Sequence, residues 1–83
     1  MARGAIDSVA VREVPIRLGQ FLKLAGLAED GGHARALLEA GEVEVNGRPE
    51  ERRGRQLTAG DVVLVGDRRA RPVLDPPEAQ PEG

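Results

Sequence analysis

The apolar residues of this chain change their spacing once, near Gly41, and that change limits the folds available to it. Before Gly41 they recur every three or four residues, which is the spacing of one face of an α-helix. After Gly41 they first alternate with charged residues, which is the spacing of a half-buried strand. This order predicts an α+β fold in which two short helices pack on a small, mainly antiparallel sheet.

Two short helices are predicted between residues 17 and 41. Gly26 is placed to end the first helix, Asp30 to cap the start of the second, and Gly41 to end it. The apolar stripe of the first helix contains Leu18, Phe21, Leu22 and Ala25, and that of the second contains Ala34, Leu37 and Leu38.

A β-hairpin is predicted directly after the second helix. Val43 and Val45 point to one face, and Asn46-Gly47 is a dipeptide that tolerates the positive φ angles of a tight hairpin turn. A second turn, "TAGD", precedes the apolar run "VVLV", which suits a buried strand, and "RRARPVL" is expected to pair with it as an edge strand. The predicted core contains Leu18, Phe21, Leu22, Leu27, Leu37, Leu38, Val43, Val45, Leu57, Val62 and Leu64.

The 83 residues are enough for one small domain, which we place at residues 15–74. Residues 1–14 are compatible with either a loose arm or an edge strand, and the acidic, proline-rich residues 75–83 are expected to be disordered. The sequence contains neither the apolar run of a signal peptide nor a membrane-spanning stretch, so we expect a cytoplasmic protein. A mostly polar surface favours a monomer.

Catalytic side chains are scarce. The chain has one histidine, one serine, one threonine and no cysteine, so we expect neither an enzyme, nor a metal site, nor a cofactor. His33 is explained as a partly exposed residue in the first turn of the second helix. The glycines Gly31-Gly32 lack the remaining residues of a phosphate-binding loop, and flexibility at the helix start accounts for them.

Basic residues are concentrated where they suit nucleic acid, although the net charge of the chain is −2. An alternative to nucleic-acid binding is an ordinary solvated surface, on which Glu50 and Glu51 form ion pairs with these basic side chains. The near absence of aromatic residues argues against base stacking and favours phosphate contacts with structured RNA. The basic residues concerned are Arg48, Arg52, Arg53 and Arg55 after the hairpin turn, and Arg17, Lys23 and Arg35 on the helices.

The segments "RLGQFLKLAGL", "GGHARALL", "GEVEVNG" and "GDVVLV", in this order between residues 17 and 65, carry a family resemblance. The chain resembles the RNA-binding domain first recognised in ribosomal small-subunit protein four, the S4 domain, in the form found in stand-alone YbcJ-like bacterial proteins. The resemblance implies an alpha-L motif, in which a helix pair and a hairpin form one surface for ribosomal or transfer RNA. The residues it places on that surface are Arg17, Arg35, Asn46, Arg48, Arg52, Arg53 and Arg55.

The chain departs from the family pattern at two places. Gly19 stands where an acidic residue commonly follows Arg-Leu, and Gly31-Gly32 stands where Ser-Arg commonly opens the second helix. One arginine that would face RNA is thereby lost, a loss that the YbcJ-like form shares. Larger members of the family join this domain to catalytic domains, and we expect no such domain in these 83 residues.

Two other functions fit parts of the pattern. A protein-interaction module without an RNA ligand would use the same fold. A β-grasp sulfur carrier would have a similar C-terminal half, in which a strand is followed by "VNG", a linker, "GD" and a second strand. Such a carrier needs a C-terminal Gly-Gly, and this sequence ends in "PEG".

For the RNA-binding function, we expect "ERRGR" to leave the strand ladder at Gly54 as a loop, so that several arginines face one ligand.

Overall fold

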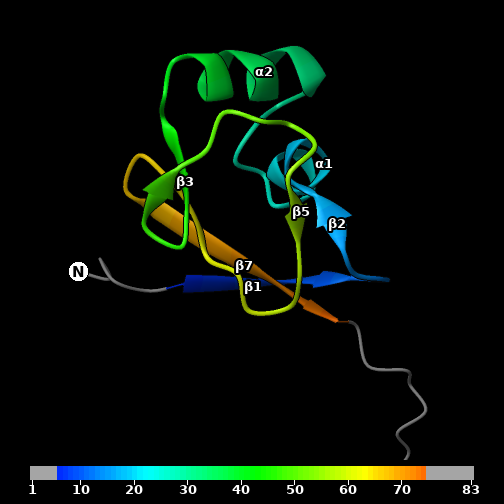
Figure 1. Cartoon of the computed structure of the whole chain (residues 1–83). Helices are drawn as coiled ribbons and strands as arrows, with labels where there is room; N and C mark the ends of the chain where they lie inside the picture. Colours follow the sequence, from blue (N-terminus) through cyan, green and yellow to red (C-terminus); the bar gives the residue numbers. More distant parts are fainter. Residues whose placement is uncertain (1–5, 75–83) are drawn as a thin grey trace, which may run out of the picture.

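Two helices lie on one side of a small sheet in the computed structural model, which describes residues 6–74 (Figure 1). The expected tail at residues 75–83 therefore lies outside the described residues. The α+β class and the two short helices are confirmed. The elements are β1 (Ile6–Val11), β2 (Ile16–Arg17), α1 (Leu18–Leu24), α2 (Gly31–Glu39), β3 (Val43–Val45), β4 (Arg48–Pro49), β5 (Gln56–Leu57), β6 (Val63–Val65) and β7 (Arg68–Leu74).

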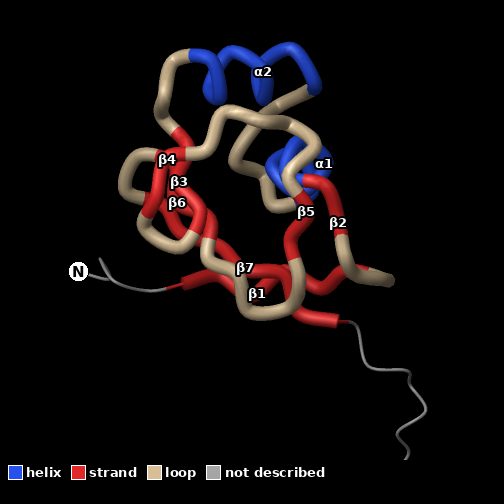
Figure 2. Tube along the Cα trace, in the orientation of Figure 1, coloured by secondary structure: helices blue, strands red, loops and turns tan. Residues whose placement is uncertain are grey.

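The larger sheet has the strand order β1-β7-β6-β3-β4. The pairs β3–β4, β3–β6 and β6–β7 are antiparallel, and β1 runs parallel to β7, so the sheet is mainly antiparallel as predicted. A separate antiparallel pair, β2–β5, joins the segment before α1 to the segment after the hairpin. Figure 2 shows this pair beside α1. No helix among residues 6–74 is long and apolar enough to cross a membrane.

The strand β7 is an inner strand, and the prediction that it forms an edge was wrong. It pairs with β6 on one side and with β1 along six residues on the other. Pro72 is tolerated there because the β6 pairing ends at Ala70, so the missing N–H of Pro72 interrupts no bond to β6. The N-terminal segment supplies the actual edge strand, β1, and its last residue, Val11, is buried in the core.

The helix α1 ends in a hydrogen-bonding pattern that requires a left-handed residue. Gly26 has a φ of 76°, and its amide donates to the Lys23 carbonyl at 3.1 Å. The next amide, from Leu27, donates to the Leu22 carbonyl at 2.9 Å. These two bonds form a Schellman motif, which glycine favours because it has no side chain to clash at positive φ.

The helix α2 begins and ends where the sequence predicts. The side chain of Asp30 accepts a hydrogen bond from the His33 amide at 2.8 Å, which satisfies one of the free N–H groups of the first turn. At the other end Gly41 has a φ of 74° and repeats the motif seen in α1. The two helices expose their polar faces and bury Ala34 and Leu38 on α2 against the rest of the core.

The hairpin of β3 and β4 is confirmed. Val45 pairs with Arg48 across the Asn46-Gly47 turn. The φ angles of the two turn residues are 54° and 85°, as a type I′ turn requires. Val43 and Val45 are both buried, so the alternation in the sequence correctly gives the inner face of β3.

The core lies between the helices and the inner face of the sheet. Most of the predicted core residues are buried there, and Leu37 is half-buried and packs against them. The assignments of Val62 and Leu64 were wrong, because both are only half-buried and Val63 between them is fully buried. Ala34, expected on the apolar stripe of the second helix, is also buried, and the core residues that the sequence analysis did not include are Val11, Ile16, Ala28, Val63 and Ala70.

Strand pairing explains the error at Val62 and Leu64. Val63 stands opposite Val45 on one neighbouring strand and opposite Ala70 on the other. Residues directly opposite one another point to the same face, so these three form one row toward the helices. An unbroken apolar run such as "VVLV" has no alternation from which this phase can be read.

Candidate nucleic-acid interface

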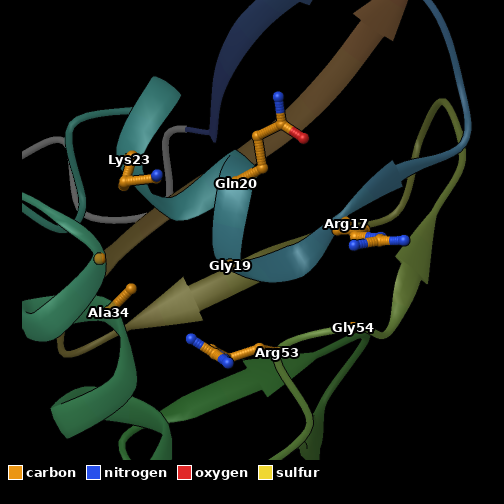
Figure 3. A pocket seen from close by; sticks show the side chains of 8 residues that line it. Arg17, Gly19, Gln20, Lys23, Ala34, Arg53 and Gly54 are labelled. Atoms are coloured by element: carbon orange, nitrogen blue, oxygen red, sulfur yellow. The ribbon is translucent and has the colours of Figure 1, made fainter.

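A basic cavity of about 440 Å³ lies where α1, the start of α2 and the turn at residues 53–54 meet (Figure 3). Three cations line it, and its lining contains no acidic residue. Within residues 6–74, none of the three cations forms an ion pair. The lining residues are Arg17, Gly19, Gln20, Lys23, Gly31, Ala34, Arg53 and Gly54.

The helix α1 supplies two polar residues of the lining because of its amphipathic pattern. Gln20 and Lys23 are three residues apart and fall on the side of the helix away from its buried stripe, and Arg17 is the extended residue directly before the helix. All three are exposed. Gln20 was not among the predicted site residues, although its spacing from Arg17 and Lys23 was available in the sequence.

The third cation, Arg53, comes from a loop that is bonded to the first turn of α1. The Gly19 amide donates to the Arg53 carbonyl at 3.0 Å, and the Leu18 amide donates to the Arg55 carbonyl at 2.8 Å. These carbonyls satisfy two N–H groups that a helix start leaves without a partner. Figure 3 shows the Arg53 side chain extending from this turn toward the side of Ala34, while Arg17 extends toward the opposite side.

Gly19 lies at the contact between the loop and the helix. A Cβ atom placed on Gly19 would lie 3.4 Å from the Cβ of Arg53 and 3.6 Å from its carbonyl oxygen. These are ordinary van der Waals distances, so the loop lies directly against α1 at this position. The residue that departs from the family pattern at this position is thus the one against which Arg53 packs.

The loop leaves the strand ladder earlier than predicted. The strand β4 ends at Pro49, and the chain turns away at Glu50 rather than at Gly54. The cause is the Glu50 carboxylate, whose Oε2 accepts the amides of Glu51 at 3.1 Å and Arg52 at 3.0 Å. These bonds turn the backbone out of the sheet directly after β4.

Glu50 also pairs with two of the arginines assigned to the site. Its Oε2 accepts the Nε of Arg52 at 3.1 Å, and its Oε1 accepts an Nη of Arg55 at 3.0 Å. The Arg52 side-chain hydrogen bond, followed by the Arg52 backbone and Arg55 hydrogen bonds, lowers the pKa of Glu50 from 4.5 to about 2. The alternative in which acidic residues neutralise these arginines is therefore confirmed for Glu50 with Arg52 and Arg55.

The remaining predicted residues lie outside the cavity lining. Arg48 is exposed on β4, and Arg35 pairs with Glu39 one turn along α2 at 3.1 Å. Asn46 donates to Asp61 at 3.0 Å and accepts the Val62 amide at 2.9 Å, so its side chain fastens the hairpin turn to the "TAGD" turn. The structure thus places Arg17, Lys23 and Arg53 in the lining of one cavity. Arg52 and Arg55 belong to the same loop as Arg53 but form ion pairs with Glu50.

His33 has a local structural contact. Its Nδ1 accepts the Glu29 amide at 3.0 Å, and the side chain is exposed at the start of α2. Among residues 6–74, no group of three histidine, cysteine, aspartate or glutamate side chains lies close enough together to hold a metal ion.

Three comparisons with known proteins agree on the family of this chain. The family model described as the S4 domain matches residues 9–71. The probable ribosome maturation protein RlbA of Bacillus subtilis (strain 168) is 56% identical over 59 residues, which are 71% of this chain and 83% of that protein. Tyrosine–tRNA ligase of Burkholderia lata is 38% identical over 65 residues, which are 77% of this chain but only 16% of the ligase.

Among solved structures, that of YbcJ from E. coli matches with a TM-score of 0.63 and 27% identity, covering 83% of this chain and 89% of YbcJ. That structure is described as revealing an alfaL motif involved in RNA binding.

Proposed function

Because the chain belongs to the S4 domain family, we propose that it is a non-catalytic protein that holds structured RNA by its phosphates. The observation that carries this proposal is the cavity whose lining includes Arg17, Lys23 and Arg53 and contains no acidic residue. Three cations that form no ion pair within residues 6–74 surround one hollow and attract a polyanion, and guanidinium groups suit phosphate oxygens.

The mode of binding follows from the aromatic content. Phe21 is the only aromatic residue of the chain, and it is fully buried in the core. No phenylalanine, tyrosine or tryptophan face is therefore available for stacking an unpaired base, which is how many single-strand binders gain affinity. Double-stranded or folded RNA, which presents a regular array of phosphates, is the better ligand for this surface.

We propose ribosomal RNA as the ligand, with transfer RNA as the second choice. The support is the similarity to a probable ribosome maturation protein, which extends over 83% of that protein. The similarity to tyrosine–tRNA ligase is lower and concerns 16% of the ligase. We further propose that the protein acts in the cytoplasm. We also propose that it is a monomer, since Leu24 and Leu74 are the only large apolar side chains exposed among the described residues.

Crosslinking in cells tests both the ligand and the surface. The tagged protein is crosslinked to RNA, and the attached RNA is sequenced, beside a variant that carries Arg17→Gln, Lys23→Gln and Arg53→Gln. We expect ribosomal RNA to be enriched with the unchanged protein and depleted with the variant. Enrichment of transfer RNA would show that transfer RNA is the ligand. If no RNA is recovered above background, the protein-interaction module becomes the better account.

A further inference from the structure

Glu50 is the one charged residue that is buried among the described residues, with 8% of its surface exposed. It lies at the boundary between the hairpin and the arginine loop, residues 50–55. Its own amide donates to the Val43 carbonyl at 3.0 Å, which anchors this boundary to β3. A buried carboxylate is retained in a fold only where its hydrogen bonds offset the loss of water.

The carboxylate gathers the backbone and the side chains of the arginine loop at one point. It accepts two backbone amides, from Glu51 and Arg52, and guanidinium groups from Arg52 and Arg55, all at 3.0–3.1 Å. Both oxygens are used. Such charge-assisted bonds fix a short loop more firmly than neutral ones do.

The loop fixed in this way is the one that carries Arg53 to α1. The carbonyls of Arg53 and Arg55 accept the first amides of the helix, and the Cβ of Arg53 packs over Gly19. Between its bonds to Glu50 at one end and to α1 at the other, the loop has little freedom. The position of Arg53 in the cavity therefore depends on both contacts.

Charge and geometry make opposite predictions for the removal of Glu50. If the loop acted only through its charge, loss of this carboxylate would release Arg52 and Arg55 and strengthen the attraction to a polyanion. If the carboxylate places the loop, its loss would weaken binding although the protein becomes more positive.

We infer that Glu50 is a positioning residue for RNA binding, which holds the arginine loop on α1 so that Arg53 faces the ligand. In this arrangement Arg52 and Arg55 support the loop, and Arg53 makes the phosphate contact together with Arg17 and Lys23. The inference rests on the proposed function, because its effect on affinity requires that the cavity binds RNA.

The test measures binding of a fluorescein-labelled RNA hairpin of mixed sequence by anisotropy over a series of salt concentrations. The variants are Glu50→Gln and, as a control with the same change of charge, Glu51→Gln at the exposed neighbouring position. We expect Glu51→Gln to tighten binding by at most about twofold, and Glu50→Gln to weaken it by roughly fivefold. The slope of log K against log salt should become shallower by about 0.7–0.9 for Glu50→Gln only.

A double-mutant cycle shows whether Glu50 acts through Arg53. Arg53→Gln alone should reproduce the weakening and the shallower slope. Combining it with Glu50→Gln should add little, because the second change removes a contact that is already lost. Full additivity of the two changes in log K would overturn the inference.

Two further measurements separate the possible failures. Hydrogen exchange of the Leu18 and Gly19 amides reports on the loop without RNA, and we expect both to lose protection in Glu50→Gln. Should Glu50→Gln fail to fold, Glu50→Asp keeps the charge but shortens the side chain, and it should still weaken RNA binding and reduce protection.

Each outcome has one meaning. Tighter binding by Glu50→Gln than by Glu51→Gln overturns the inference and means that Glu50 competes with RNA for Arg52 and Arg55. Unchanged protection of the two α1 amides in a folded Glu50 variant also overturns it. If the unchanged protein shows no salt-dependent binding, the RNA-binding proposal itself fails, while the exchange measurement still decides whether Glu50 holds the loop.

Discussion

Replacing Phe21 by alanine should remove a large part of the stability of this fold. Phe21 has 0% of its surface exposed and is the only aromatic residue of the chain. Truncating a buried phenylalanine to alanine costs about 3–5 kcal/mol. A chain of 83 residues has a free energy of unfolding of about 4–12 kcal/mol, so the loss is a large fraction of the total.

Thermal unfolding followed by circular dichroism measures this loss. In a domain of this size each kcal/mol lowers Tm by about 4–8 °C, which predicts a decrease of about 12–40 °C for Phe21→Ala. Leu24→Ala is the matched control, because Leu24 lies on the same helix with 53% of its surface exposed, and it should change stability by less than about 0.5 kcal/mol. A Phe21→Ala variant that melts within a few degrees of the unchanged protein would refute the packing of α1 described above.

Two other changes test local features of the fold. Asn46→Ala should cost about 1–3 kcal/mol in a urea titration, because it strains a turn residue with a φ of 54° and removes the bonds to Asp61 and the Val62 amide. An unchanged midpoint would show that the two turns are not fastened together. Because the folded-state pKa of Glu50 is depressed, its stabilising contribution should be fully present above pH 4.5 and be lost as the pH falls toward about 2. The difference in unfolding free energy between the unchanged protein and Glu50→Gln should shrink over that range, and a difference that stays constant with pH would contradict the assignment.

The local elements of the fold were predictable because their signals lie within a few residues. Helix stops at Gly26 and Gly41, the cap at Asp30 and the turn at Asn46-Gly47 each depend on one residue and its immediate neighbours. Each of them was therefore predicted correctly from the residues around it.

The pairing of distant strands was not predictable in the same way. The position of β7 inside the sheet depends on β1, which lies some sixty residues earlier in the chain. The inward direction of Val63 depends on Val45 and Ala70 opposite it. Neither relation leaves a periodic signal in its own segment, so the edge and the core face were assigned wrongly.

The candidate site was predictable by residue type but not by partner. The sequence indicates a cluster of arginines after the hairpin, and the structure separates them according to what each contacts. Arg52 and Arg55 pair with Glu50, while Arg53 lines the cavity with Arg17. A pattern of charges along the chain does not show which of them neutralise one another, because that depends on the path of the loop.

We propose that the cations of the cavity bind RNA phosphates, and the salt dependence of binding tests this most directly. The measurement compares the unchanged protein with the variant carrying Arg17→Gln, Lys23→Gln and Arg53→Gln, and with Arg71→Gln as a control. Arg71 is exposed on β7 and contacts Ser8 of β1, away from the cavity lining.

If each cavity cation neutralises one phosphate, the slope of log K against log salt should become shallower by about 2 to 3 in the triple variant, and Arg71→Gln should leave it unchanged. Circular dichroism should show that the triple variant remains folded, since all three side chains are exposed. An unchanged slope in the triple variant, or a change in Arg71→Gln as large as the change per cavity cation, would contradict the account.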